Sequence, residues 1–207
     1  LDNLVAYLNR NPEIVEVILS GGDPVNLPFR ALEMTLRRLS RETGTSDFRL
    51  HTRNVVFAPH MLTEQFCRLL GEYNVRIFIH VVHPYELTEQ SISRIGLLQR
   101  YGVRCYSQFP VLRGINDHPV VLHRLLEKLD NLRVRPISLF IPDPINYSAS
   151  FRIPLTRLFA IIDELNWRTP AWTNATRLVL DTPVGKVRRE DIVAWDKERR
   201  IVTFSRE

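Results

Sequence analysis

The feature that most constrains this fold is an alternation of strand-like and helix-like patterns, with strand starts about 30 residues apart, the length of a βαβ unit. Such an alternation predicts a parallel sheet covered by helices, and right-handed crossovers would wind it into an open sheet or a barrel. The apolar, β-branched runs expected as strands are 14–20, 47–52, 75–82, 103–109 and 134–141. The amphipathic stretches expected as helices are 29–43, 62–74, 88–102 and 117–131. A further helix is predicted over 154–166, a short strand over 177–181 and a β-hairpin over 191–204 that turns at 196–198.

Composition and charge exclude several classes of protein. No apolar run approaches the roughly 18 residues that cross a bilayer, so we expect no membrane association. The net charge is +5, but the basic residues are scattered and almost all are arginine, so nucleic-acid binding is not favoured. The arginine fork suits carboxylate and phosphate, so small anionic ligands fit this composition better. Two cysteines, Cys67 and Cys105, form neither a disulfide framework nor a CxxC motif, which favours a reducing, cytoplasmic setting.

Polar residues gather where the predicted strands end. In a parallel α/β fold the carboxyl ends of the strands meet at one edge, where ligand sites form. Each group alone also has a simpler interpretation: "GGDP" is a common turn, and "RGIND" could be a loop into a helix capped by Asn116 or Asp117. The coincidence of all the groups at one predicted edge favours a site. The residues concerned are Ser20–Asp23, His51–Arg53, His80, Gln108, Arg113–Asp117, Asp143 and Asp181.

Lys186 stands out because the chain has only three lysines. It follows a glycine in "DTPVGKV", whereas Lys128 lies in a charged helical stretch and Lys197 lies in the predicted hairpin turn. A lysine amine in such a place could form a Schiff base with a carbonyl compound, including pyridoxal phosphate. The simpler interpretation is an exposed loop lysine.

Six motifs occur in an order that resembles the lysine 2,3-aminomutase family: "SGGDP", "HTR", "HVVHPYELT", "QFPVLRGIND", "FIPDP" followed by "SFRIPL", and "LDTPVGKV". The resemblance covers nearly the whole chain. It implies a partial TIM-like (βα) radical S-adenosylmethionine (SAM) barrel over 1–166 and a C-terminal extension over 167–207 that carries the lysine loop and the hairpin. It also implies an isomerase that uses SAM, pyridoxal phosphate and a [4Fe–4S] cluster to move the α-amino group of L-lysine, or a similar diamino acid, from C2 to C3.

The resemblance also implies roles for particular residues. Ser20, Gly21, Gly22 and Asp23 match the loop that lies against the methionyl part of SAM. Gln108 matches another SAM contact, and His80 lies nearby as a weaker candidate. Asp143 and Asp181 match the acids that hold the distal ammonium of the substrate, because a desolvated ammonium needs paired carboxylates. Lys186 matches the lysine that links covalently to pyridoxal phosphate.

The sequence departs from the family in three places. The cluster motif CxxxCxxC is absent, and the two cysteines lie far apart in the sequence. In the family this motif precedes "SGGDP", and because the chain does not begin with Met, we expect the cluster ligands upstream, in a longer protein. The loop before Lys186 is only "PVGK", where the family has several glycines. Val82 stands where the family commonly has Asn.

Two other functions remain open at this stage. The first is a non-catalytic relative that binds SAM or an amino acid and has lost the iron–sulfur cluster. The second is a Schiff-base aldolase that uses Lys186. If the protein is an enzyme, either the aminomutase or the aldolase, the expected partner is a small-molecule substrate, with no nucleic acid and no membrane. Whether the chain forms a homo-oligomer is left open.

Overall fold

The computed structural model describes residues 1–143, 145–172, 176–183 and 185–205 of the 207-residue chain. Contacts between residues divide these into two compact units. Unit 1 comprises residues 1–81, 85–107 and 129–135, and unit 2 comprises 82–84, 108–128 and the remainder from 136. These units do not test the predicted division into a barrel over 1–166 and a C-terminal extension over 167–207, which stays a prediction.

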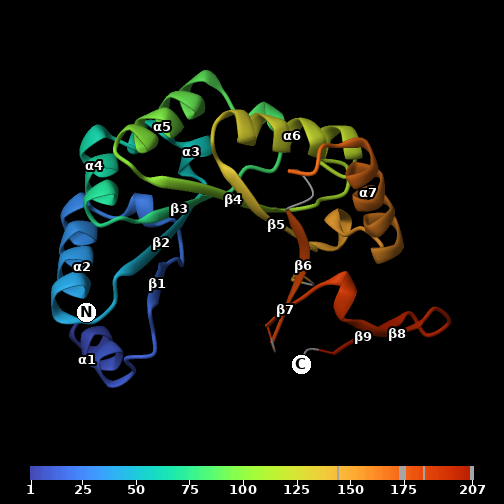
Figure 1. Ribbon diagram of the computed structural model, residues 1–207, viewed down its shortest axis with the longest axis horizontal. Coiled ribbons are helices and arrows are strands. Elements are labelled where there is room, and N and C mark those ends of the chain that lie inside the picture. Colours follow the sequence, from blue (N-terminus) through green and yellow to red (C-terminus); the bar gives the residue numbers. More distant parts are fainter. Residues whose placement is uncertain (144, 173–175, 184, 206–207) are drawn as a thin grey trace. The chain divides into compact units, whose positions relative to one another are not determined.

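The strands of unit 1 are parallel and lie in sequence order, as the alternating pattern predicted (Figure 1). Within the described residues, hydrogen-bonded neighbours then continue in sequence order from β4 to β7. The strands of unit 1 are β1 (Glu16–Leu19), β2 (Asp47–Thr52), β3 (Arg76–Ile79) and β4 (Arg104–Pro110), of which the last continues into unit 2. Its helices are α1 (Asp2–Arg10), α2 (Phe29–Glu42), α3 (Asn54–Phe57), α4 (Glu64–Glu72) and α5 (Glu89–Arg100).

The core of unit 1 lies between this sheet and its helices. Along β2, burial alternates so that Phe48, Leu50 and Thr52 are buried, which is the period of two that a strand imposes. The buried side chains of α2 recur at Leu32, Leu36 and Leu39, the three-to-four spacing of one helix face. Figure 1 shows α2, α4 and α5 packed along one face of this sheet.

Two helices of unit 1 begin and end at residues that are typical of helix ends. Thr63 caps α4 by accepting a hydrogen bond from Phe66 N–H, and Thr88 caps α5 by accepting one from Ser91 N–H. Gly102 follows α5 with a φ of 76°, the left-handed conformation in which glycine ends a helix at little cost. The helices α1 and α3 were not predicted. The four-residue α3 is too short to show a period, whereas α1 has apolar residues at the helical spacing of Leu4, Val5 and Leu8 and was overlooked.

Unit 2 combines parallel and antiparallel pairing. Strand β5 pairs parallel with β6, β6 pairs antiparallel with β7, and β8 pairs with β9 in the predicted hairpin. The strands are β5 (Arg135–Phe140), whose first residue belongs to unit 1, β6 (Arg177–Thr182), β7 (Gly185–Val187), β8 (Ile192–Asp196) and β9 (Ile201–Phe204). The helices are α6 (Pro119–Asn131), which continues into unit 1, and α7 (Leu155–Arg168).

The interpretation of Asn116 or Asp117 as a helix cap is wrong. Helix α6 begins at Pro119, and the Asn116 side chain is fully buried within the preceding loop. Its Oδ1 accepts from Leu112 N–H at 2.6 Å, and its Nδ2 donates to the carbonyls of Val82 at 2.9 Å and Pro110 at 3.0 Å. Asn116 therefore closes the "RGIND" loop and joins it to the segment that follows β3.

The predicted α/β class, with parallel strands, outer helices and a C-terminal hairpin, is confirmed. Within the described residues, no helix combines the length and apolarity that crossing a bilayer requires.

Candidate functional site

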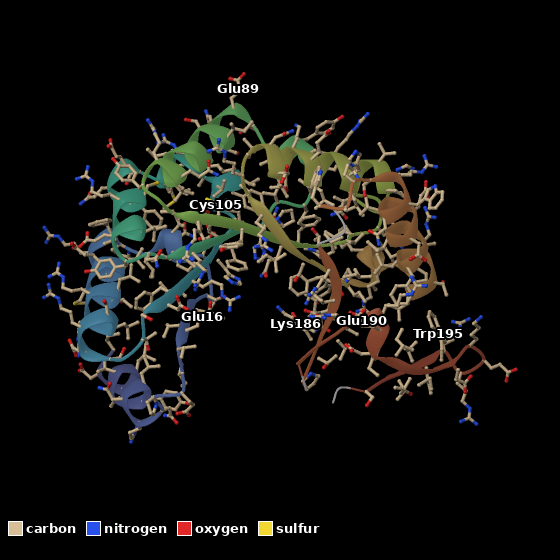
Figure 2. All side chains as sticks on the ribbon, in the orientation of Figure 1. Glu16, Glu89, Cys105, Lys186, Glu190 and Trp195 are labelled. Carbon is tan, nitrogen blue, oxygen red and sulfur yellow. The ribbon has the colours of Figure 1, made fainter. Side chains whose placement is uncertain are left out.

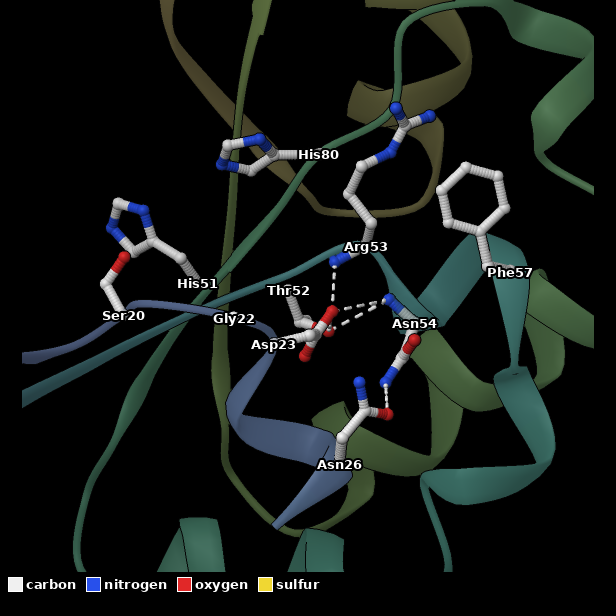
Figure 3. Close-up of a pocket in the computed structure, with 10 residues that line it drawn as sticks. All are labelled: Ser20, Gly22, Asp23, Asn26, His51, Thr52, Arg53, Asn54, Phe57 and His80. Atoms are coloured by element: carbon white, nitrogen blue, oxygen red, sulfur yellow. Dashed lines mark hydrogen bonds between the residues drawn. The ribbon is translucent and has the colours of Figure 1, made fainter.

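A pocket of about 430 Å³ lies in unit 1, where β1, β2 and β3 end (Figure 3). Three neighbouring parallel strands supply it, so residues far apart in the sequence meet at one edge, as predicted for this fold. Of the predicted SAM-binding residues, Ser20, Gly22, Asp23 and His80 line the pocket, and Gly21 lies between two of them in the chain. The other lining residues are Asn26, His51, Thr52, Arg53, Asn54 and Phe57.

The backbone of the loop after β1 needs glycine for its conformation. Gly21 has a φ of 92° and Gly22 a φ of 67°, both in the region that side chains with a Cβ rarely adopt. A Cβ built on either residue would meet no atom within 4 Å, so open space adjoins the backbone here. The loop therefore presents bare peptide groups to whatever occupies the pocket.

Asp23 braces this loop against the segment that follows β2. Its Oδ2 accepts hydrogen bonds from Thr52 Oγ1 at 2.8 Å, from Arg53 N–H at 2.8 Å and from Asn54 N–H at 3.2 Å. Its Oδ1 accepts from Val25 N–H at 3.1 Å, which caps the short 3₁₀ turn at Pro24–Asn26. Four hydrogen-bond donors thus bind the two carboxylate oxygens, and Asp23 therefore holds the loop in place.

Two histidines share the pocket with this network. The rings of His51 and His80 lie 5.7 Å apart, and the His51 ring also stacks on Phe78 at 5.1 Å. Burial lowers the pKa of His80, and the nearby charge of Arg53 lowers it further, against a smaller opposite effect of Asp23. His80 is therefore neutral at pH 7 and can both donate and accept a hydrogen bond.

Arg53 is a charged lining residue that the sequence did not single out as a ligand. Its Nη2 donates to Glu86 Oε1 at 2.8 Å, and its guanidinium carbon lies 4.4 Å from the centre of the Phe57 ring. The sequence placed Arg53 at a strand end, which located it correctly without indicating what it binds. Thr52 and Asn54 were likewise given no role, because their partner Asp23 is about 30 residues away in the chain.

Four of the predicted site residues lie in unit 2. Gln108 lies on β4 with 8% of its surface exposed, and Asp143 follows β5 with its side chain exposed. Asp181 on β6 and Lys186 on β7 are paired across the antiparallel ladder. Residues paired in this way project from the same face of a sheet, so the carboxylate and the amine share a face.

Lys186 is exposed and projects from β7 (Figure 2). Its Nζ lies 4.9 Å from the centre of the Phe140 ring, a contact in which the aromatic face attracts the ammonium. The sequence interpretation placed this lysine in a loop. In the structure, the residues after the turn form a three-residue strand, so backbone pairing fixes where the lysine side chain starts.

The two cysteines do not form a metal site. Burial raises the pKa of Cys67 to about 11 and the pKa of Cys105 to about 12, so both are neutral thiols at pH 7. Among the described residues, no group of three or more His, Cys, Asp or Glu side chains could hold a metal ion. These residues therefore do not fit a [4Fe–4S] cluster, which requires thiolate ligands.

A solved structure shares this fold. A radical SAM methyltransferase from Sphaerobacter thermophilus aligns with a TM-score of 0.61 over 88% of this chain and 57% of its own, at 16% sequence identity. At that identity the likeness shows the fold alone, parallel strands alternating with helices. A comparison with models of protein families gave no match.

Curated relatives give the sequence relationship. The L-lysine 2,3-aminomutase of Methanococcus maripaludis is 30% identical over 207 residues, which cover 98% of this chain and 48% of the relative. The enzyme of the same name from Bacillus subtilis is 32% identical over 186 residues, which cover 89% of this chain and 39% of the relative. The chain spans about half, or less, of the length of these relatives. Over nearly its whole length, this chain is therefore homologous to part of the lysine 2,3-aminomutases.

Proposed function

We propose that this chain is part of a radical SAM aminomutase that moves the α-amino group of L-lysine, or of a similar diamino acid, from C2 to C3. The observation that carries the proposal is the pocket itself. In a chain homologous to lysine 2,3-aminomutases, three strand ends bring Ser20, Gly22, Asp23 and His80 together around one cavity. These are the residues that the family motifs connect with SAM.

The residues of the pocket fit SAM. Open space adjoins the backbone at Gly21 and Gly22, so peptide groups of this loop can contact the methionyl part of the cofactor directly. Asp23 keeps the loop in place through its four hydrogen bonds, and His80, neutral at pH 7, adds an imidazole ring at the end of β3. Gln108 lies in unit 2, and its role as a SAM contact stays a prediction from the family motifs.

The residues of unit 2 fit the substrate and pyridoxal phosphate. Asp143 and Asp181 supply two carboxylates, which is what a desolvated alkyl ammonium needs and what a glutamate side chain would not tolerate. The exposed amine of Lys186 is accessible for a covalent link to the aldehyde of pyridoxal phosphate. When bound, that cofactor supplies stabilisation of reactive intermediates at the amino-acid carbons.

The described residues do not fit the iron–sulfur cluster, so no step is assigned to it in this chain. The chain corresponds to about half of its relatives, and under this proposal the cluster ligands belong to another part of the protein. The part described here binds and orients SAM, holds the distal ammonium and provides the lysine for pyridoxal phosphate.

The test uses the full-length protein, purified without oxygen. We expect about four iron atoms per chain for one cluster, conversion of L-lysine to β-lysine, and a pyridoxyl group on Lys186 after borohydride reduction and peptide mapping. The variant K186R should lose both the pyridoxyl group and turnover. K197R is the matched control, since Lys197 is an exposed lysine in the hairpin turn, and it should keep both. Iron and turnover without a pyridoxyl group on Lys186 would contradict its assigned role.

One observation favours the alternative of a non-catalytic relative that binds SAM or an amino acid. The two cysteines of this chain are buried neutral thiols, whereas residues that the family motifs connect with SAM line one pocket. A full-length protein that binds SAM, contains no iron after anaerobic purification and cluster reconstitution, and leaves lysine unchanged would establish this alternative and refute the aminomutase.

A further inference from the structure

Arg152, the arginine of the "SFRIPL" motif, ties together a loop of unit 2, the Asp143 loop, described at residues 143 and 145–152. Its Nε donates to Ser148 Oγ at 3.2 Å, and its Nη2 donates to Ser148 Oγ at 3.1 Å and to the Ile145 carbonyl at 3.2 Å. Among the described residues, Arg152 has no ion-pair partner. The guanidinium is therefore engaged by neutral oxygens of this one loop.

Ser148 passes this restraint on to Asp143. Its Oγ accepts both bonds from Arg152 and shares its own proton between the Asp143 carbonyl at 3.0 Å and the Ile145 carbonyl at 2.7 Å. The Ile145 N–H donates to the same Asp143 carbonyl at 2.8 Å. The backbone of Asp143 is thus held by two donors, and Arg152 aligns one of them.

Hydrogen bonds rather than burial give the Asp143 loop its shape. Tyr147 has a φ of 63°, a left-handed conformation that is uncommon for a bulky side chain, and 99% of its surface is exposed. Strain of this kind persists only where the surrounding structure holds the backbone. At the far end of the loop, the Phe151 carbonyl accepts from Arg113 N–H at 2.9 Å. The bonds of Ser148 and Arg152 therefore hold a conformation that no packed core supports.

The carboxylate of Asp143 depends on this shape. The residue is exposed, and none of the described residues donates a hydrogen bond to its side chain or forms an ion pair with it. The carboxylate is therefore available to a ligand, but its position is set by the backbone alone. A site that holds a charged group needs such a side chain fixed by its neighbours, because hydrogen bonds between charged groups are short and directional.

We propose that Arg152, acting through Ser148, is a positioning residue that directs the Asp143 carboxylate to the distal ammonium of the amino-acid substrate. The inference rests on the proposed function, which assigns that ammonium to Asp143 and Asp181. The sign of the charge on Arg152 separates positioning from simple electrostatics. A guanidinium repels an ammonium, so loss of its charge alone would strengthen substrate binding, whereas loss of positioning would weaken it.

The test measures binding without turnover, on full-length protein purified without oxygen and loaded with pyridoxal phosphate, in the absence of SAM. The probes are L-lysine and L-norleucine, which has the same carbon chain and no distal ammonium. Each is titrated while the absorbance of the bound pyridoxal phosphate is followed. R152Q and S148A should each raise the Kd for L-lysine about 5- to 50-fold, the loss expected for one or two hydrogen bonds. The Kd for L-norleucine should change by less than about twofold, within the energy of one weak contact.

Three further variants define the expected pattern. D143N should show the same loss specific to L-lysine, because it removes the charge that Arg152 positions. The double variant S148A/R152Q should lose no more than the weaker-binding single variant, since both residues act through one chain of bonds. R157Q and S150A are the matched controls, because both residues are exposed and neither side chain bonds to the Asp143 loop within the described residues. Both controls should leave the two Kd values unchanged.

The outcomes separate this inference from the proposed function. Unchanged or tighter L-lysine binding by R152Q and S148A would show that the inference is wrong, and so would equal weakening of both ligands. Normal L-lysine binding by D143N would remove Asp143 from the substrate site and refute the inference, while the rest of the proposed function stands. A wild-type protein that responds to neither amino acid would refute the proposed function, and the inference with it. Urea unfolding of each variant shows that it is folded, and S148A decides the outcome if R152Q is not.

Discussion

The carboxylate of Asp23 accepts a hydrogen bond from the Thr52 hydroxyl at 2.8 Å, which ties the end of β1 to the end of β2. The Thr52 hydroxyl also accepts from Asn54 N–H at 2.9 Å, and Asn54 Nδ2 donates to Asn26 Oδ1 at 2.8 Å. The two loops are thus joined by a continuous network. A glycine loop with two residues at positive φ needs such support to keep one conformation.

The variant D23N should destabilise the protein by about 1.5 to 3 kcal/mol, the usual contribution of hydrogen bonds to a charged group. An amide can accept on one side only, and its NH₂ group would face donors that the carboxylate now satisfies. Urea unfolding followed by circular dichroism measures the change. The control is D163N, which removes an exposed ion pair with Arg189 and should cost less than about 1 kcal/mol. Equal midpoints for D23N and the wild type would contradict the bracing role.

Stability should fall on mild acidification because of His80. Its pKa is lowered in the folded protein, so between the ordinary histidine pKa of about 6.5 and the lower folded value, the unfolded chain binds a proton that the folded chain does not. The contribution of His80 to stability is therefore fully present above pH 6.5 and is lost as the pH falls through this window. We expect the difference in urea midpoint between pH 7.5 and pH 5.5 to be smaller in H80Q than in the wild type. An unchanged difference would show that His80 is not the group responsible.

Gly71 and Gly96 provide a matched pair of glycine-to-alanine substitutions in neighbouring helices. A Cβ at Gly71 on α4 would lie 2.1 Å from the carbonyl oxygen of Tyr101, a backbone atom that cannot move aside cheaply. G71A should therefore destabilise by about 1 to 3 kcal/mol, the usual cost of overpacking. A Cβ at Gly96 on α5 would meet no atom within 4 Å, so G96A should stabilise by about 0.5 to 1 kcal/mol through helix propensity. Thermal unfolding shows whether each variant is more or less stable than the wild type. A stabilised G71A would refute the predicted clash between the added Cβ and the Tyr101 carbonyl oxygen.

Local sequence patterns predicted the elements well and the site only in part. The apolar spacing of Leu122, Leu125, Leu126 and Leu129 predicted α6, and all four side chains are fully buried. Such patterns work because a helix or strand repeats its buried face every few residues. The partners of Asp23 lie about 30 residues away, and no local pattern records a contact between two loops. The strand that carries Lys186 was missed for a related reason, since three residues are too few to show a period.

The two cysteines should react slowly with thiol reagents in the folded protein. Burial raises the pKa of Cys67 to about 11 and that of Cys105 to about 12, and the thiolate is the reactive form. At pH 8 the thiolate is therefore scarce, and the surrounding core also blocks the reagent, since both side chains are buried, Cys67 in α4 and Cys105 in β4.

The measurement is labelling with iodoacetamide at pH 8, followed by mass spectrometry of the peptides that contain each cysteine. We expect little labelling of either residue in the native protein and complete labelling of both in urea. Because only unfolding exposes these thiols, D23N and G71A should raise the logarithm of the labelling rate in proportion to their loss of stability, about tenfold in rate per 1.4 kcal/mol, whereas G96A should lower the rate. Rapid native labelling of Cys67 or Cys105 would mean that the thiol is exposed and ionised. It would then also remove the reason for excluding that cysteine as a cluster ligand.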